Sequence, residues 1–174
     1  MERIEIRESV QGDLAAIERL YPDAFPDEDL LPLVRGLLQG TVDVLSLAGI
    51  IDSSLVGHVI FTTCDLAGNN NKVALLGPLA VASAWQKQGI GSELMRAGLY
   101  RLEKAGVSHI CVLGDPAYYE RFGFTPEARI TPPYALPPEW SDAWQSMSLG
   151  STERPISGKL SVPEPWLSPA LWLP

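Results

Sequence analysis

The feature that most limits the fold is residues 42–81, where three apolar runs follow one another with short polar separators. The runs are rich in leucine and β-branched residues and cover residues 43–51, 55–65 and 73–81. The separators are Asp52-Ser53-Ser54 and Gly68-Asn69-Asn70-Asn71, which consist of residues typical of turns. Runs of this length between such turns predict three consecutive antiparallel strands joined by hairpins.

Two short helices are expected before these strands. The first follows Gln11-Gly12-Asp13, with Asp13 as its N-cap, and ends at Pro22. The second runs from Asp27 to Gln39, where leucine and valine recur at helical spacing. The pair is expected to cover one side of the sheet.

A long helix is expected after the strands, over residues 88–105, because apolar residues form one stripe and charged residues the other. Gly106 would end it in the position where a left-handed cap is common. The other expected elements are strands over residues 2–7, 109–113 and 143–149, and a short helix from Asp115-Pro116 to Arg121 that Gly123 ends.

The charge and length of the chain limit its partners. It has 174 residues, which suit one domain, and a formal net charge of -8 from 13 basic and 21 acidic side chains. This negative field would repel a phosphate backbone, so nucleic acid is not an expected partner. The same field would favour a cationic amine.

The start of the chain and its cysteines both indicate the cytoplasm. Residues 1–7 alternate charged with apolar side chains, so neither a signal peptide nor a membrane partner is expected. Cys64 and Cys111 lie in strand-like runs without zinc-ligand spacing. Buried free thiols are therefore expected rather than a disulfide, and no metal.

The junction between the third tandem strand and the long helix is a candidate anion site. Its sequence is Leu79-Ala80-Val81-Ala82-Ser83-Ala84-Trp85-Gln86-Lys87-Gln88-Gly89-Ile90-Gly91-Ser92. The first N–H groups of a helix lack internal partners, and the helix dipole adds positive potential there. Gly89 and Gly91 remove side chains where a pyrophosphate must approach, and Lys87 adds charge. The two glycines alone would favour a plain strand-to-helix turn over an anion site.

Two longer patterns resemble one family. Leu79-x-Val81 followed by Gln86-x-x-Gly89-x-Gly91-Ser92 resembles motif A of the GNAT N-acetyltransferase superfamily. Tyr119-Glu120-Arg121-Phe122-Gly123-Phe124 is similar to its Tyr-x-x-x-Gly-Phe signature, at about the expected distance. With Leu113-Gly114-Asp115-Pro116 before it, this segment is most similar to a predicted-acetyltransferase subgroup. The resemblance covers most of residues 1–150.

The resemblance implies a fold and a cofactor. The fold is α/β (α+β), with a mixed, mostly antiparallel central sheet flanked by helices and a splayed cleft for acyl-CoA. Acetyl-CoA is the implied co-substrate. Its pantetheine arm would pair with the backbone of Leu79, Ala80 and Val81, and its pyrophosphate would lie at Gln86, Lys87, Gln88, Gly89, Ile90, Gly91 and Ser92. Gln86 is the uncharged variant of a position that is arginine or glutamine in the family, and Ser83 replaces a frequent proline, which is expected to loosen the loop slightly.

The resemblance also implies roles in acetyl transfer. Tyr119 matches the general acid that protonates the departing thiolate, and its neighbour Tyr118 is then a packed aromatic residue. A backbone N–H near Leu79 would stabilise the oxyanion. The implied reaction is direct attack by a neutral amine of a small molecule or peptide. The rival is a non-catalytic acyl-CoA sensor, which would not need Tyr119.

The general base stays open, because residues 73–81 contain no carboxylate. The candidates are Glu28, His58, Asp65 and Asp115. For His58 a structural imidazole is favoured over a base, because it alternates with apolar residues in a strand.

The last part of the chain differs in composition. Ten of the fifteen prolines and four of the five tryptophans lie from Pro126 to Pro174. We assign residues 1–150 to the transferase domain and residues 151–174 to a covering segment of that domain. Trp140 and Trp144 are expected either to line the acceptor pocket or to seal the sheet edge or a homodimer contact.

Overall fold

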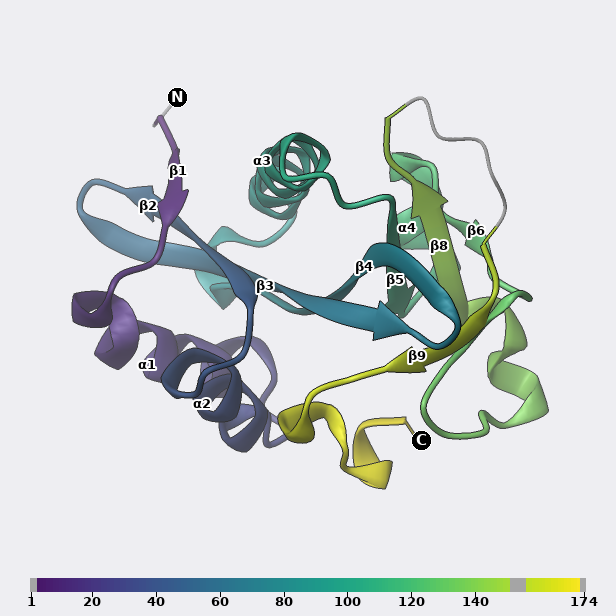
Figure 1. The fold of residues 1–174 in the computed structure, drawn as a ribbon. Coiled ribbons are helices and arrows are strands. Elements are labelled where there is room, and N and C mark those ends of the chain that lie inside the picture. Colours follow the sequence, from purple (N-terminus) through teal and green to yellow (C-terminus); the bar gives the residue numbers. More distant parts are fainter. Residues whose placement is uncertain (1–2, 151–155, 173–174) are drawn as a thin grey trace. The chain divides into compact units, whose positions relative to one another are not determined.

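The three tandem strands are present in the computed structural model, which describes residues 3–150 and 156–172 (Figure 1). They are β2 (Val44–Ile51), β3 (Ser54–Leu66) and β4 (Asn69–Val81). β2 pairs antiparallel with β3, and β1 (Glu5–Glu8) pairs antiparallel with β2. These strands form the core of the predicted sheet.

The connection between β3 and β4 is shorter than predicted. Asn69 and the two asparagines after it belong to β4, so only Ala67 and Gly68 remain outside the strands. Gly68 has a φ of 76°, and a residue of positive φ allows a two-residue hairpin connection. The prediction that Gly68-Asn69-Asn70-Asn71 forms the turn is therefore wrong.

The remaining elements follow in chain order. They are α1 (Leu14–Ala24), α2 (Leu31–Gln39), α3 (Ile90–Lys104), β5 (His109–Leu113), α4 (Pro116–Tyr119), β6 (Thr125–Pro126), β7 (Ile130–Thr131), β8 (Trp144–Ser148) and β9 (Gly158–Ser161). α3, β5 and β8 lie close to their predicted bounds. β6, β7 and β9 were not predicted, because strands of two to four residues are too short to show alternation.

The chain divides into two compact units, which we describe separately. The first contains the residues up to Thr62 and Gly77–Arg101. The second contains Thr63–Leu76 and the described residues from Leu102 onward. β3, β4 and α3 therefore each contribute residues to both units.

In the first unit, α3 packs closely against one face of β3. A Cβ atom added to Gly57 of β3 would lie 2.9 Å from both Ile90 Cγ2 and Leu94 Cδ1 of α3. A Cβ atom added to Gly98 of α3 would lie 2.3 Å from the ring of Phe61 on β3. Each element thus carries a glycine opposite a large apolar side chain of the other, which sets their close approach.

The other face of β3 in this unit is covered by α1 and α2 (Figure 1). His58 follows Gly57 in the strand, so its side chain points to the opposite face. There its Nδ1 atom lies 2.7 Å from Tyr21 Oη of α1. The buried apolar side chains of the two helices are Ile17, Leu20, Leu33, Val34 and Leu37. The prediction that this pair covers one side of the sheet is confirmed.

α1 begins directly after Asp13 as predicted, but the Asp13 side chain does not cap it, and the helix ends later than predicted. The Asp13 carboxylate accepts hydrogen bonds from the Val10 N–H (2.7 Å) and from the Arg7 guanidinium (2.8 and 3.0 Å), instead of capping the helix. The bonds to Arg7 hold the pKa of Asp13 below its usual range. The helix continues past Pro22 to Ala24, because a proline this close to the end disturbs only the last turn.

α2 begins later than predicted, at Leu31 rather than after Asp27. Pro32 occupies the first turn, where the missing N–H of proline has no helical partner to lose. A helix that began after Asp27 would place Pro32 in its interior. The proline therefore sets the start of α2, and Asp27 is not its cap.

In the second unit, β5 is the central strand. It pairs parallel with β4 over Val73–Leu75 and antiparallel with β8 over its whole length. β8 also pairs with β6, while β9 pairs with the end of β3 and with β7. The side chains of residues 109–112 are all buried, as predicted for a central strand.

Three tryptophans form a cluster in the second unit. Trp144 Nε1–H donates to the Ile130 carbonyl (2.8 Å), and Trp172 Nε1–H donates to the Trp166 carbonyl (3.0 Å). The ring centroid of Trp172 lies 5.7 Å from that of Trp144 and 5.9 Å from that of Trp166. Of the two roles left open for the tryptophans, Trp144 has the packing role, whereas Trp140 lies in a 3-10 helix and is half-buried.

Parts of two predicted segments lie outside the described residues. They are residue 2 of the first strand, and residues 151–155 and 173–174 of the covering segment. Over the ranges that are described, every helix is too short or too polar to cross a membrane.

Candidate active site

The junction between β4 and α3 belongs to the first unit. β4 ends at Val81, and a 3-10 turn over Ser83–Trp85 follows. α3 begins at Ile90, and the Glu93 N–H donates to the Gly89 carbonyl (3.0 Å). The N–H groups that precede Glu93 lie at the helix start, where helical acceptors are lacking. A helix terminus suited to an anion therefore follows a buried strand, as predicted.

The loop before α3 has a backbone that makes N–H groups converge. Lys87 has a φ of 63° and Gly89 a φ of 86°, whereas Gln88 between them is not in the positive region. Alternation of this kind directs successive N–H groups into one anion-binding concavity. A Cβ atom added to Gly89 would meet no atom within 4 Å, so the space beside it is open. The geometry fits a pyrophosphate that approaches the backbone here.

The two glutamines of this loop stabilise it by side-chain hydrogen bonds to nearby backbone carbonyls. Gln86 Nε2 donates to the Val81 carbonyl (3.1 Å), and Gln88 Nε2 donates to the Ala84 carbonyl (3.4 Å). The Gln86 amide thereby ties the loop to the end of β4. Lys87, in contrast, is exposed, and its ammonium is available to an anion in solution.

The part of β4 that does not pair with β5 is the candidate binding site for the pantetheine arm. The register with β5 covers Val73–Leu75 and does not extend to Leu79, Ala80 and Val81. The Ala80 side chain is buried, while those of Leu79 and Val81 are half-buried. The backbone in this stretch is therefore suited to completing a ladder with an extended ligand.

A contact that the sequence did not reveal fixes the loop. The Asp23 carboxylate, in the last turn of α1, accepts hydrogen bonds from the Ser83 N–H (2.8 Å) and the Ser83 hydroxyl (2.7 Å). These bonds lower the pKa of Asp23. The expectation that Ser83 loosens the loop is therefore wrong, because its hydroxyl and N–H hold the loop to α1.

Tyr119 lies in the second unit, at the end of α4. The Asp115 carboxylate caps this helix by accepting the Ala117 N–H (3.0 Å). The Tyr119 ring packs edge-on against Phe124, with centroids 5.7 Å apart. Burial raises the pKa of Tyr119 above the usual value, so the phenol stays protonated. Within the described ranges no hydrogen bond engages its hydroxyl, which is free to donate a proton.

Tyr118 has a different environment. The Arg121 guanidinium lies over its ring, with Cζ 4.6 Å from the centroid, and Arg121 Nε donates to the Tyr118 carbonyl (3.2 Å). Burial raises the pKa of Tyr118, and the nearby Arg121 charge acts in the opposite direction. Tyr118 therefore forms a cation–π pair, as a packed aromatic residue can.

Gly114 sets the position of the Tyr119 ring. A Cβ atom at residue 114 would lie 2.5 Å from Tyr119 Cε2, closer than two carbon atoms approach. We expect Gly114→Ala to displace the ring and to lower the free energy of unfolding by about 1–3 kcal/mol, the usual cost of overpacking. The melting temperature should fall accordingly, and any reaction that uses Tyr119 should slow. Differential scanning calorimetry and a thiol-release assay measure these effects.

Gly12→Ala is the matched control, since a Cβ atom there would meet no atom within 4 Å. It should leave the melting temperature nearly unchanged. A Gly114→Ala variant as stable and as active as the parent would contradict the packing role.

The candidates for a general base occupy different positions. His58 is fully buried between Tyr21 Oη and Ser46 Oγ, each 2.7 Å from a ring nitrogen, and burial lowers its pKa to about 4. It therefore has the structural role favoured from the sequence. Asp115 is engaged as the cap of α4, whereas Glu28 and Asp65 are exposed carboxylates.

The two cysteines are buried free thiols, as predicted. Burial raises the pKa of Cys64 to about 12 and that of Cys111 well above its usual value. A thiolate nucleophile is therefore disfavoured at neutral pH. In residues 3–150 and 156–172, no three His, Cys, Asp or Glu side chains gather as a metal site would require.

Comparison with known proteins identifies the family of this chain. The model of the acetyltransferase (GNAT) domain matches residues 48–126. An uncharacterized N-acetyltransferase of Escherichia coli K12, YjhQ, is 30% identical over 162 residues, which cover 89% of this chain and 90% of YjhQ. The chain belongs to the GNAT family of N-acetyltransferases. A second E. coli relative, the uncharacterized N-acetyltransferase YhbS, is 32% identical over 68% of this chain and 72% of its own length.

Solved GNAT structures have the same fold. The crystal structure of E. coli YhbS in complex with CoA has a TM-score of 0.87 and 27% identity, over 95% of this chain and 93% of that one. A GNAT acetyltransferase from Brucella melitensis in complex with acetyl-CoA has a TM-score of 0.77 and 27% identity, over 95% and 99%. The predicted GNAT fold and transferase class are confirmed, and the predicted cofactor agrees with the ligands of these two relatives.

Proposed function

We propose that this GNAT protein transfers the acetyl group of acetyl-CoA to a primary amine of a small molecule or peptide by direct attack. The observation that carries the proposal is the cradle before α3, where Gly89 leaves open space beside converging N–H groups. A non-catalytic acyl-CoA sensor would have the same cradle. The free, protonated hydroxyl of Tyr119 favours the enzyme, because a sensor has no use for it.

Three groups of residues have roles in this reaction. Bound acetyl-CoA supplies an activated thioester. The backbone of Leu79–Val81 pairs with the pantetheine arm, and an N–H near Leu79 stabilises negative charge on the carbonyl oxygen. The residues from Gln86 to Ser92 hold the pyrophosphate. Tyr119 donates its proton to the departing sulfur.

The acceptor is a cation in its resting form, and a pocket of the first unit suits it. A cavity of about 330 Å³ lies between the end of α1 and the start of α2. Among the residues that the structure describes, Asp27, Glu28 and Asp29 line it and no Lys or Arg does. Three carboxylates attract an ammonium group. The Asp23–Ser83 contact joins this end of α1 to the cradle loop.

Glu28 is the base that we favour within this pocket, acting through water. It lines the cavity and is exposed, so it can take a proton from the acceptor and release it to solvent. His58 is fully enclosed, with both ring nitrogens engaged, and cannot contact an acceptor directly.

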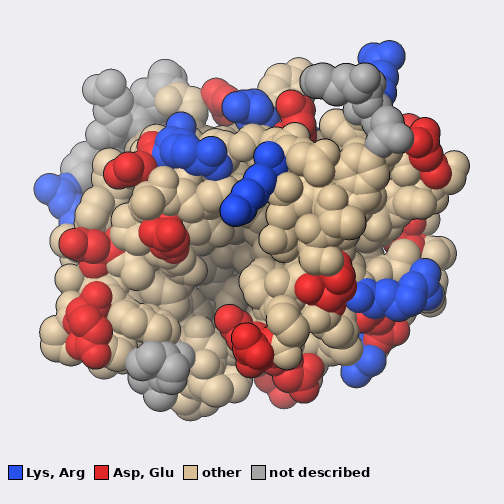
Figure 2. Space-filling model, turned by 180° about the vertical axis from the view of Figure 1, so that it is seen from behind, with Lys and Arg blue, Asp and Glu red and all other residues tan. Residues whose placement is uncertain are grey.

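Surface charge and thiols bear on the cellular setting. On the face drawn in Figure 2, basic side chains are scattered among acidic and uncharged ones without one continuous basic surface. A nucleic-acid partner remains unexpected on charge. Buried free cysteines suit a reducing compartment, which supports our proposal of a cytoplasmic location. A homodimer and the division at residue 150 stay predictions.

A screen of acceptors by thiol release tests the proposed reaction. Aliphatic amines, amino acids and peptides with a free N-terminus are incubated with acetyl-CoA and the protein. Cationic amines should raise thiol release well above the acceptor-free rate, and acceptors with added carboxylates should do so less. Buried Cys64 and Cys111 keep the background of the thiol reagent low. Tight CoA binding in calorimetry with no release for any amine would favour the sensor.

A further inference from the structure

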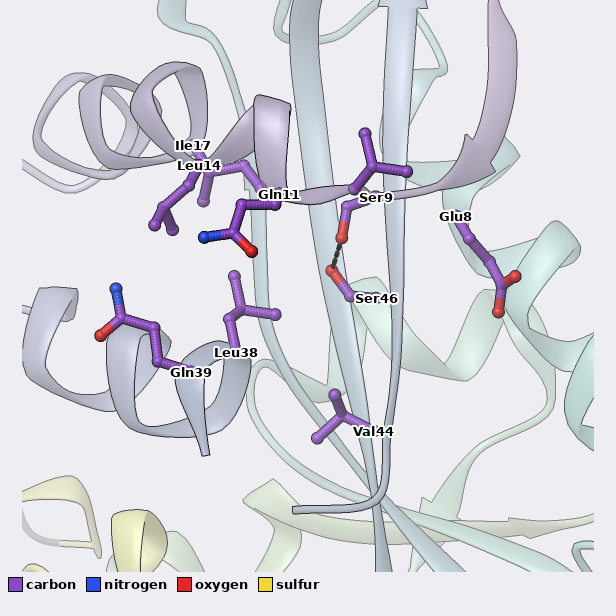
Figure 3. Close-up of a pocket in the computed structure, with 10 residues that line it drawn as sticks. Glu8, Ser9, Gln11, Leu14, Ile17, Leu38, Gln39, Val44 and Ser46 are labelled. Atoms are coloured by element: carbon purple, nitrogen blue, oxygen red, sulfur yellow. Dashed lines mark hydrogen bonds between the residues drawn. The ribbon is translucent and has the colours of Figure 1, made fainter. Parts of the chain in front are cut away.

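A second cavity of the first unit lies apart from the cradle. Its volume is about 510 Å³, within the range of small-molecule sites. Its apolar lining residues are Val10, Leu14, Ile17, Leu38 and Val44, and its main polar groups are Ser9, Gln11, Gln39 and Ser46. Figure 3 shows the two glutamine amides facing the space between the start of α1 and the end of α2, with the serines on the side of the sheet.

This cavity is at the opposite end of α1 from the proposed acetyl-transfer site. Leu14, the first residue of α1, lines the cavity, whereas Asp23 near the end of the helix binds Ser83 of the cradle loop. A helix of this length spans about 16 Å, at about 1.5 Å per residue. A ligand in this cavity is therefore distinct from CoA and from the acceptor.

A buried chain of hydrogen bonds ends at the cavity. Ser9 Oγ lies 2.5 Å from Ser46 Oγ, Ser46 Oγ lies 2.7 Å from His58 Nε2, and His58 Nδ1 lies 2.7 Å from Tyr21 Oη. His58 is 0% and Tyr21 1% exposed. The four side chains come from the segment after β1, from β2, from β3 and from α1, so the fold itself assembles the chain.

The direction of these hydrogen bonds follows from burial. Tyr21 has His58 Nδ1 as the hydrogen-bond partner of its hydroxyl, and a buried O–H donates to an available acceptor. Neutral His58 then carries its proton on Nε2, which donates to Ser46 Oγ. The Ser46 hydroxyl donates in turn to Ser9 Oγ. The Ser9 hydroxyl is thus the last donor, and the residues that the structure describes offer it no acceptor.

We propose that this cavity binds a small uncharged aliphatic carboxamide, whose carbonyl oxygen accepts the Ser9 hydroxyl. The amides of Gln11 and Gln39 can both donate and accept, so they complement the N–H and carbonyl groups of the same carboxamide. A carboxylate ligand is disfavoured, because Glu8 lines the cavity and no Lys or Arg of the described residues does. An ammonium ligand is disfavoured because it cannot accept a hydrogen bond from Ser9.

Three molecules of nearly equal shape test this chemistry. Isovaleramide, isovalerate and isoamylamine are titrated into the full chain, and backbone and side-chain amide signals are followed by NMR. Isovaleramide should shift the signals of Ser9, Gln11, Gln39 and Ser46 saturably, with an affinity at least about tenfold above those of the two charged molecules. Absence of saturable shifts at these residues, or equal binding of isovalerate, would overturn the proposal.

Two further measurements examine the hydrogen-bond chain itself. Ser9→Ala should weaken isovaleramide binding by about threefold to tenfold, the range for one hydrogen bond, while Ser54→Ala at the exposed start of β3 should not. ¹⁵N-labelled histidine should show His58 protonated on Nε2 alone. Protonation on Nδ1, or an unchanged affinity in Ser9→Ala, would refute the assigned direction. Both readouts are independent of acetyl transfer.

Discussion

Replacing Gly89 with glutamate should reduce CoA binding by more than about 100-fold, below detection in calorimetry. The new carboxylate would stand in the open space beside Gly89, among the N–H groups proposed to receive the pyrophosphate. Bringing two like charges together costs several kcal/mol, and about 2.7 kcal/mol already corresponds to 100-fold. Unchanged affinity would show that the cofactor is not held at this loop.

Gly106→Glu is the matched control for this substitution. Gly106 has a φ of 84°, close to the 86° of Gly89, and a Cβ atom there would also meet nothing within 4 Å. Gly106 follows α3, whereas Gly89 precedes it. Both variants therefore carry similar backbone strain and the same added charge, but only the Gly89 variant should lose CoA.

Removing the hydroxyl of Tyr119 should have the second large effect. We expect Tyr119→Phe to lower kcat by about one to three orders of magnitude, the range for losing a general acid, with little change in CoA affinity. The ring should stay in place, because its contacts with Phe124 and Gly114 do not involve the hydroxyl. Steady-state kinetics and calorimetry measure the two quantities separately.

Tyr118→Phe provides the comparison for Tyr119. Its contact with the Arg121 guanidinium is made by the ring and is kept in phenylalanine. Loss of the hydroxyl should therefore change kcat less than threefold, which is at most the effect of one weak hydrogen bond. If Tyr118→Phe were slow and Tyr119→Phe fast, the wrong tyrosine would have been assigned.

In the parent protein the raised pKa of Tyr119 keeps its phenol protonated above the usual pKa of about 10, so its ionisation should not limit the rate below that pH.

The elements that could be predicted were those with long, regular patterns. β2, β3, β5 and α3 have apolar residues at a constant spacing, and their ends carry turn residues or a glycine such as Gly106. The start of α2 was misplaced because Asp27 looked like a cap, whereas Pro32 decides where the helix can begin. Local patterns compete at helix ends, and the steric requirement of proline is the stronger one.

The parts of the site that could not be predicted depend on residues far apart in the sequence. Asp23 and Ser83 are 60 positions apart, and nothing near either of them indicates the other. The series of hydrogen bonds from Ser9 through Ser46 and His58 to Tyr21 joins side chains from four separate segments of the sequence. Gly114 could have been noticed beside the Tyr119 motif, but its closeness to the ring depends on the turn into α4. Such contacts appear only when the elements are folded together.

The division of the chain has a consequence for the order in which the protein forms during synthesis. The unit with the cofactor cradle is complete once Arg101 has been added, but the tryptophan cluster of the other unit needs Trp172. At about 5–20 residues per second, the ribosome needs about 4–14 seconds to pass from one to the other. Nascent chains should therefore gain the cradle first, and the tryptophan cluster last.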